Sequence, residues 1–170
     1  MTAKARWTDD EVVSDVLGLV LDAVEAVLRA APDVEVRLDT LHQLGDTQQV
    51  LMAISIATLD QLGDGLEYLG TTTGGDLAAV LLDRAVQFDV APRSTVHAAA
   101  CRLEVVVRHD RWQLTRELRR SRAAGSDAEL VAGAIALLAA IVELSARRRG
   151  LAPALMAECL CRAASSLQPT

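Results

Sequence analysis

The sequence predicts an all-α protein, a single-domain antiparallel bundle of about six to eight helices with flexible ends at about 1–7 and 168–170. Along most of the chain, apolar residues recur with a period near 3.6, which is the period of a helix. About half of the 170 residues are apolar, so one core is enough without disulfides or metal. Leu, Val, Ile and Ala must build this core, because the aromatic residues are only Trp7, Tyr68, Phe88 and Trp112.

The first predicted helix begins at a capping box and is apolar over most of its surface. Thr8 is its N-cap, Glu11 follows three residues later, and the helix ends near Ala30, before Pro32. Its solvent-facing side is a narrow stripe formed by Glu11, Asp15, Gly18, Asp22, Glu25 and Arg29. We expect the helix to be central or shared with a second subunit, because one neighbour cannot cover so wide an apolar arc.

Glycine-containing breaks divide the middle of the chain. The tetrapeptide Gln-Leu-Gly-Asp occurs at 43–46 and 61–64, where glycine can close one helix and aspartate can cap the next. The helix predicted between the two copies spans about 47–62, and its inward residues are Val50, Leu51, Ile54, Thr58 and Leu62. A loop at 70–75 precedes a helix over 76–88, whose inward residues are Leu77, Val80, Leu81 and Val86. Only 33–38 alternates like a strand, and one short strand makes no sheet.

The C-terminal half contains the clearest helix. After a break at 91–92, residues 95 to about 124 form one bent helix or two, and a joint at 109–110 favours two. A second capping box at Ser126 and Glu129 opens a helix that Gly150 closes, and Pro153 suits the first turn of a last helix ending near Leu167. The apolar run at 130–142 is shorter than the roughly 18 to 20 residues that span a bilayer, so we expect a buried core helix.

Cysteine usage and the N-terminus indicate a cytoplasmic protein. Cys101, Cys159 and Cys161 are an odd number and cannot form a closed set of disulfides. No apolar signal core follows Lys4 and Arg6. Arginine also far outnumbers lysine, which is typical of a GC-rich genome, and we expect a bacterial source.

Two patterns that resemble chemical sites are incomplete. Gly70 and Gly75 have the glycine spacing of a phosphate-binding loop, but Asp76 stands where that motif needs lysine. His97 and Cys101 are one helical turn apart with Glu104 nearby, but no second cluster completes a metal site. We therefore interpret His97 and Cys101 as packing residues and expect no cofactor and no metal.

The sequence contains no recognisable catalytic motif. His42 and His109 have no evident serine or cysteine partner in the sequence, and the chain contains no nucleophile elbow. These observations favour a protein without enzymatic activity.

Charge is distributed unevenly along the chain. Residues 1–90 carry sixteen acidic and five basic side chains, a net charge of −11, whereas residues 91–170 carry seven and twelve, a net charge of +5. If the segment around 108–122 is one continuous helix, four arginines share a face that we call the arginine face: Arg108, Arg111, Arg119 and Arg122. Arginine there can bind carboxylate or phosphate with two hydrogen bonds. The alternative is a solvated helix side whose own partners are Glu104, Asp110 and Glu117.

We expect a non-enzymatic interaction or regulatory protein that self-associates, as a homodimer, or binds another protein through apolar helix faces and complementary charge. The predicted binding residues are the arginine face and, as its acidic complement, Glu11, Asp15, Asp22 and Glu25. The alternative is a helical regulatory domain with a small-molecule cavity, although so few aromatic residues offer little stacking surface. Nucleic-acid binding is disfavoured by the net charge of −6 and by the lack of aromatic residues among the arginines.

Overall fold

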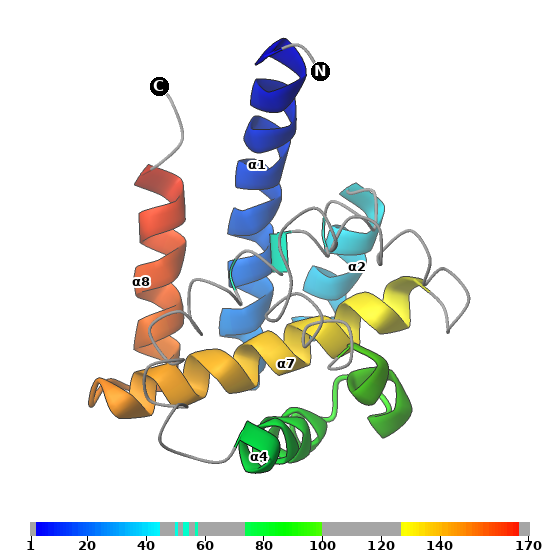
Figure 1. Cartoon of the computed structure of the whole chain (residues 1–170), viewed down its shortest axis with the longest axis vertical. Helices are drawn as coiled ribbons and strands as arrows, with labels where there is room; N and C mark the ends of the chain where they lie inside the picture. The colour runs from blue at the N-terminus through cyan, green and yellow to red at the C-terminus, as the bar shows by residue number, and fades with distance from the viewer. Residues whose placement is uncertain are drawn as a thin grey trace.

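The described part of the chain is helical. The computed structural model describes residues 3–44, 50, 53–54, 57, 74–99 and 127–166. Its named helices are α1 (Ala3–Leu28), α2 (Val34–Leu44), α4 (Gly74–Gln87), α7 (Asp127–Arg148) and α8 (Pro153–Ser166), shown in Figure 1. Residues 50, 53–54, 57 and 93–99 are helical as well, and no described residue lies in a strand. The all-α prediction is confirmed for these residues.

Helix α1 is central among the described helices. It packs between α2 and α8, and it also contacts α7, which runs crosswise at one end of the three (Figure 1). Helix α1 runs in the opposite direction to α2 and to α8. A short connection joins α1 to α2, which favours this antiparallel arrangement. Helix α4 lies against the other side of α7. The apolar arc of α1 is therefore covered within the chain over the residues whose side chains are described.

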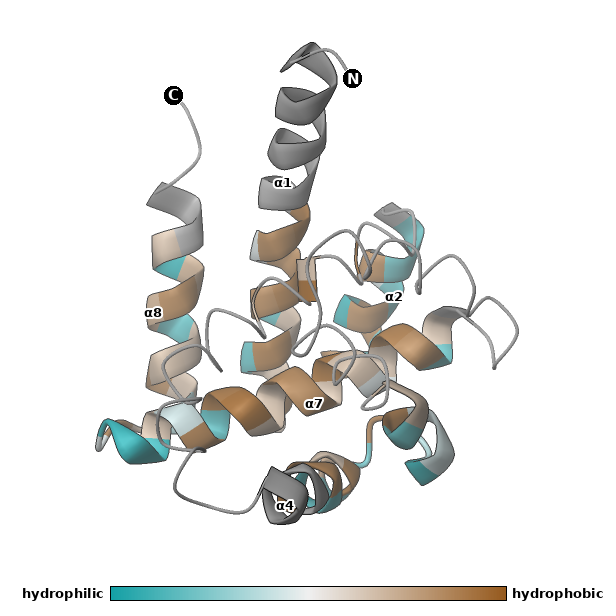
Figure 2. Cartoon of the chain, in the orientation of Figure 1, coloured by the Kyte–Doolittle hydropathy of each residue, from teal (hydrophilic) through white to brown (hydrophobic). Residues whose placement is uncertain are grey.

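Helix α7 forms the centre of the core. Every residue from 130 to 143 is buried, and Ile135 and Leu138 are completely inaccessible. Figure 2 shows the middle of α7 mostly in the brown of apolar residues. A Cβ atom added at Gly133 would lie 3.0 Å from the carbonyl oxygen of Thr95, so glycine permits a close backbone approach here. Residues that pack in the same cluster come from all the named helices and include Val20, Val24, Leu41, Val50, Ile54, Ala85, Val96 and Met156.

The length of α7 exceeds the apolar run counted in the sequence. Residues 128–148 form a stretch of 21 residues that is long and apolar enough, by length and composition alone, to cross a membrane. In this structure 83% of its most apolar window is buried inside the protein. The core helix of a soluble protein passes the same length test, so the finding is weak evidence for a membrane span.

The beginning of α1 differs from the prediction. The helix begins at Ala3, so Thr8 lies inside the helix rather than at its N-cap. Ala and the long basic side chains before Thr8 have high helix propensity, and no proline or glycine stops the helix there. The residues before Thr8 therefore extend the helix past the capping box.

The strand-like segment at 33–38 is also helical. It belongs to the end of the α1–α2 turn and the first part of α2. Val34 and Leu38 pack against the core and Leu41 is buried, whereas Val36 is 65% exposed. The inward residues therefore follow the spacing of a helix, which the short alternation at 33–38 concealed. Helix α2 ends at Leu44, directly before the Gly45 that was expected to close it.

The predictions for the middle of the chain are partly confirmed. Val50 and Ile54 are helical and buried as predicted, whereas Leu51, Thr58 and Leu62 lie outside the described residues. Helix α4 begins at 74 rather than 76, so Gly74 and Gly75 belong to the helix. Val80 was expected to face inward but is 58% exposed, because Leu81, Ala85 and Val86 define the inward side.

The C-terminal boundaries agree closely with the sequence signals. Gly150 has a φ of +67°, its N–H donates to the carbonyl of Arg147, and the N–H of Leu151 donates to the carbonyl of Ala146. These two bonds form a Schellman motif, so Gly150 closes α7 as predicted. Pro153 begins α8 as predicted, and the helix ends at Ser166, next to the expected Leu167.

Candidate functional site

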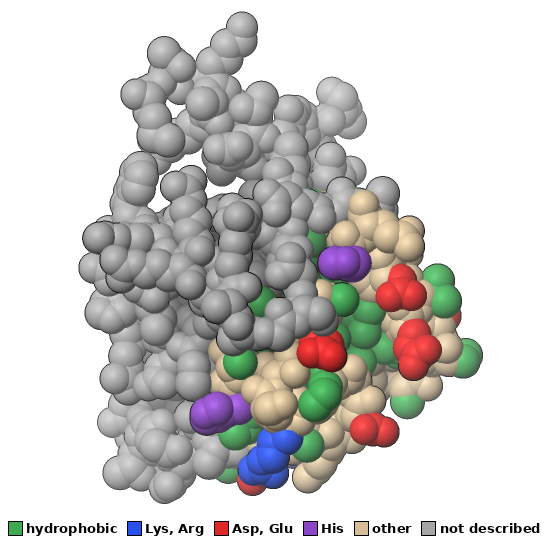
Figure 3. All heavy atoms as spheres, turned by 90° about the vertical axis from the view of Figure 1, so that its right-hand side faces the viewer, with side chains coloured by type: hydrophobic (Ala, Val, Ile, Leu, Met, Phe, Trp, Pro, Cys, Tyr) green, Lys and Arg blue, Asp and Glu red, His purple; other side chains and the backbone are tan. Residues whose placement is uncertain are grey.

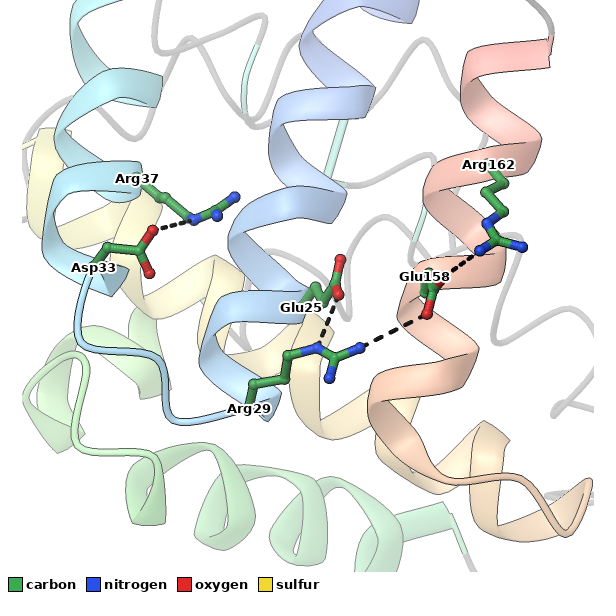
Figure 4. Close-up of polar contacts among 6 residues, drawn as sticks. All are labelled: Glu25, Arg29, Asp33, Arg37, Glu158 and Arg162. Carbon is green, nitrogen blue, oxygen red and sulfur yellow. Dashed lines mark hydrogen bonds and ion pairs between the residues drawn. The ribbon is translucent and has the colours of Figure 1, made fainter.

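Three helices present a network of charged side chains that we call the charged ladder: Glu25, Arg29, Asp33, Arg37, Glu158 and Arg162 (Figure 4). Arg29 lies at its centre, with its Nε 2.8 Å from Glu25 Oε1 and its Nη2 3.7 Å from Glu158 Oε2. It thereby links α1 to α8, while Arg162 binds Glu158 within α8. On α2, Arg37 Nε donates to Asp33 Oδ2 at 2.9 Å.

The ladder follows from a repeated local pattern in the sequence. In each of its three acid–arginine pairs the carboxylate precedes the arginine by four residues, which places both side chains on one helix face in the favourable order. Such exposed pairs contribute only about 0.3–0.5 kcal/mol each. The ladder therefore shapes the surface potential more than it stabilises the fold.

Beside the ladder, Asp22 and Glu25 of α1 meet Cys161 of α8. The ligand atoms of these three residues all lie within 4.8 Å of one another. Burial, followed by the charges of Asp22 and Glu25, raises the pKa of the Cys161 thiol to about 12. Because of this raised pKa, Cys161 is a neutral thiol rather than a thiolate nucleophile. A metal ion at this site would have to displace the thiol proton and compete with Arg29 for Glu25.

A second charged contact joins α4 to the buried helix α7. The guanidinium of Arg84 binds Glu143 with two hydrogen bonds, from Nε to Oε2 at 2.5 Å and from Nη2 to Oε1 at 3.0 Å. Arg147 adds a third at 3.2 Å, and Phe88 lies under the guanidinium with its ring centre 4.5 Å away. The bond from Arg84 lowers the pKa of Glu143, which is therefore a satisfied anion that joins two helices rather than a proton donor.

A third feature is an open cavity of about 250 Å³ that we call the acidic groove. Its rim carries the carboxylates of Glu35, Asp39 and Glu129, and its apolar lining is Leu38, Val90, Ala91, Pro92, Ala128 and Ala132. The groove lies where α2 meets the beginning of α7 and the turn after α4. Figure 3 shows the face of the molecule that carries α2, on which acidic side chains gather around apolar ones.

Only part of the predicted partner site falls on described side chains. Asp22 and Glu25 lie next to each other on α1 as expected. Glu11 and Asp15 belong to α1, but their side chains, like the whole arginine face, lie outside the described residues.

The sequence interpretation of the second cluster also needs a correction. His97 was expected to be a packing residue, but it is exposed, because the inward positions of the 93–99 helix are taken by Val96 and Ala99. Cys101 and Glu104 lie outside the described residues.

No local sequence pattern predicts the contacts between distant residues that form these sites. Arg84 and Glu143 are 59 residues apart, and Cys161 comes close to Asp22 only because α8 packs on α1. The acidic groove likewise combines residues from three separate segments.

Comparison with known proteins finds no matching protein-family model, no matching curated protein and no matching solved structure. A functional assignment therefore depends on the chemistry of this chain's own residues.

Proposed function

We propose that this chain is a non-enzymatic helical interaction or regulatory protein that self-associates through complementary charge. The observation that carries the proposal is the separation of charge along the sequence, with −11 in residues 1–90 and +5 in residues 91–170. Two surfaces of opposite sign on one chain can pair twice across a two-fold axis, because each copy offers both halves of the contact. A homodimer is therefore the simplest assembly, and an acidic or basic partner protein is the alternative.

The proposed basic surface is the arginine face, and the proposed acidic surface lies among the N-terminal helices. Guanidinium groups bind carboxylates with two parallel hydrogen bonds, which fixes the orientation of the two copies. Exposed ion pairs contribute only about 0 to 1 kcal/mol each, so they set the orientation and the rate of association. Apolar contacts must supply most of the affinity.

The described apolar surface limits where such contacts lie. The described side chains of α1 bury their apolar face within the chain, from Val16 to Val27. The exposed large apolar residues are found instead on other segments: Val36, Val80, Leu151 and Leu155. We propose that apolar contact between copies involves Val36, next to Glu35 on α2, rather than the described face of α1.

Two buried or half-buried groups support a binding role over catalysis. Cys161 is held as a neutral thiol, and Glu143 is held as an anion by two arginines, so neither is poised to react near neutral pH. The shared core of α1, α2, α4, α7 and α8 supports one domain, which we propose to be a cytoplasmic bundle of about six to eight helices.

Sedimentation velocity at two salt concentrations tests this function. The Arg111→Glu/Arg119→Glu variant should lose self-association at about 0.05 M salt, and the parent should itself dissociate partly at about 0.5 M salt, where charges are screened over a few ångströms. Arg148→Glu/Arg149→Glu makes the same change of charge at the end of α7 and should associate like the parent. A parent that is monomeric at both salt concentrations would contradict the proposal.

A further inference from the structure

Two carboxylates of the acidic groove, Glu35 and Asp39, lie side by side on α2. Glu35 and Asp39 are one turn apart on α2, and like charges at this spacing repel by about 0.2–0.5 kcal/mol. Neither carboxylate makes an ion pair with any residue that the structure describes. In contrast, Glu25, Asp33 and Glu158 of the charged ladder each bind an arginine.

The groove also has a lining that suits one particular kind of cation. Leu38, Val90 and Pro92 provide an apolar wall directly beside the carboxylates of Glu35 and Asp39. A long side chain with an apolar stem and a cationic end satisfies both parts at once, whereas a hydrated metal ion would leave the wall unused. Arginine fits best, because its planar guanidinium can bind two carboxylates while its methylene groups cover apolar surface.

The size of the groove favours a side chain over a free small molecule. Pockets for drug-sized ligands enclose about 300–1,000 Å³ and are largely closed, whereas this open groove encloses about 250 Å³. A side chain delivered by a folded partner does not need an enclosed pocket, because the surrounding protein surface excludes water.

We propose that the acidic groove binds an arginine of the arginine face from a second copy of this chain. The inference rests on the proposed self-association and names its docking point. It moves the acidic complement from Asp22 and Glu25, where Glu25 already binds Arg29, to Glu35 and Asp39, which no described cation neutralises. Two grooves and two arginine faces then pair across one two-fold axis.

An exchange of charge between two variants tests the docking point. The groove variant is Glu35→Arg/Asp39→Arg, and the face variant is Arg111→Glu/Arg119→Glu. Each variant alone should associate at least about tenfold more weakly than the parent at about 0.05 M salt, because its groove and its arginine face carry like charge. An equimolar mixture should recover association, since each groove then faces an arginine face of opposite sign. Circular dichroism spectra and melting curves verify that both variants are folded.

Two further variants separate the groove from other acidic surfaces. Glu158→Arg reverses a charge on α8, away from the groove, and should associate like the parent. Asp22→Arg/Glu25→Arg tests the acidic residues of α1. If only this last variant weakens association, or if the mixture stays dissociated, the groove proposal is overturned while self-association stands. A parent that never associates overturns the proposed function itself.

Discussion

Arg84 and Glu143 form a two-bond ion pair that joins α4 to α7, the most deeply buried of the described helices. Glu143 is 7% exposed, so it depends on protein groups rather than water to balance its charge. Arg84 supplies two of its three hydrogen bonds, and Arg147 supplies the third. The pair therefore explains how a carboxylate is tolerated in a helix whose other buried residues, apart from Ser145, are apolar.

Removing Arg84 should destabilise the protein measurably. We expect Arg84→Met to lower the free energy of unfolding by about 1–2 kcal/mol, because a buried carboxylate loses two hydrogen bonds while Arg147 and solvent compensate in part. Arg93→Met is the matched control, since Arg93 binds Asp83 in a pair whose side chains are 66% and 60% exposed. It should cost less than about 0.5 kcal/mol. Urea unfolding measures both, and equal losses would contradict the structural role of Arg84.

The same pair gives the stability a predictable dependence on pH. The pKa of Glu143 is lower in the folded protein than its ordinary value of 4.5, so the folded state favours the ionised form. This contribution is fully present above pH 4.5 and is lost as the pH falls through the folded pKa. Glu143→Gln should therefore be less stable than the parent at neutral pH, and the difference should shrink in acid. Urea midpoints across this range check it, and a constant difference would exclude the ionised form as the cause.

Two helix ends with positive φ angles provide an opposing pair of substitutions. Ala30 closes α1 with a φ of +50°, and Gly150 closes α7 with a φ of +67° and no atom near its absent Cβ. Left-handed backbone costs a non-glycine residue about 1–2 kcal/mol, partly offset by the lower entropy of its unfolded chain. Ala30→Gly should thus stabilise by about 0.5–1 kcal/mol, and Gly150→Ala should destabilise by a similar amount. Thermal melting distinguishes the two, and shifts in the same direction would contradict the backbone argument.

Two glycines inside helices should respond in opposite ways to alanine. Gly18 has no atom within 4 Å of a built Cβ, so Gly18→Ala should stabilise α1 by about 0.5–1 kcal/mol through helix propensity. At Gly133 the new methyl group would lie 3.0 Å from the backbone oxygen of Thr95, and backbone yields less easily than a side-chain end. Gly133→Ala should therefore destabilise despite its better propensity. Chemical unfolding of both variants checks this, and a stabilised Gly133→Ala protein would show that residues 93–99 do not pack so closely on α7.

Local signals in the sequence predicted the ends of α7 and α8 well, because a glycine or a proline fixes the backbone wherever the rest of the chain lies. Gly150 and Pro153 are examples. Signals that compete with their neighbours were less reliable. Thr8 does not begin α1, and the alternation around Val34 is part of a helix, since packing of α2 on α1 decided the period.

The candidate sites were harder to predict, because they depend on contacts between distant segments. The sequence identified Asp22 and Glu25 as neighbours on one helix, but only the packing of α8 on α1 brings Cys161 to them. In the sequence, Glu35 is only part of a strand-like alternation, and its groove exists only because α2 meets α7. Tertiary packing, which has no local signature, decides both features.

Thiol chemistry tests the environment of Cys161 directly. A thiol with a pKa of about 12 is almost entirely protonated near neutral pH, and the thiolate is the form that reacts with alkylating reagents. Cys159, two residues away, is exposed and serves as the internal reference. We expect iodoacetamide to modify Cys159 readily and Cys161 only slowly in the folded protein, as measured by peptide mass spectrometry.

Asp22→Asn should speed the reaction of Cys161, because it removes one of the negative charges that raise the thiol pKa. The labelling rate at Cys159 should stay unchanged in the same variant. A faster rate at both cysteines would instead indicate that the variant has loosened the packing of α8. Equal labelling of the two cysteines in the folded parent would show that Cys161 is not held beside Asp22 and Glu25.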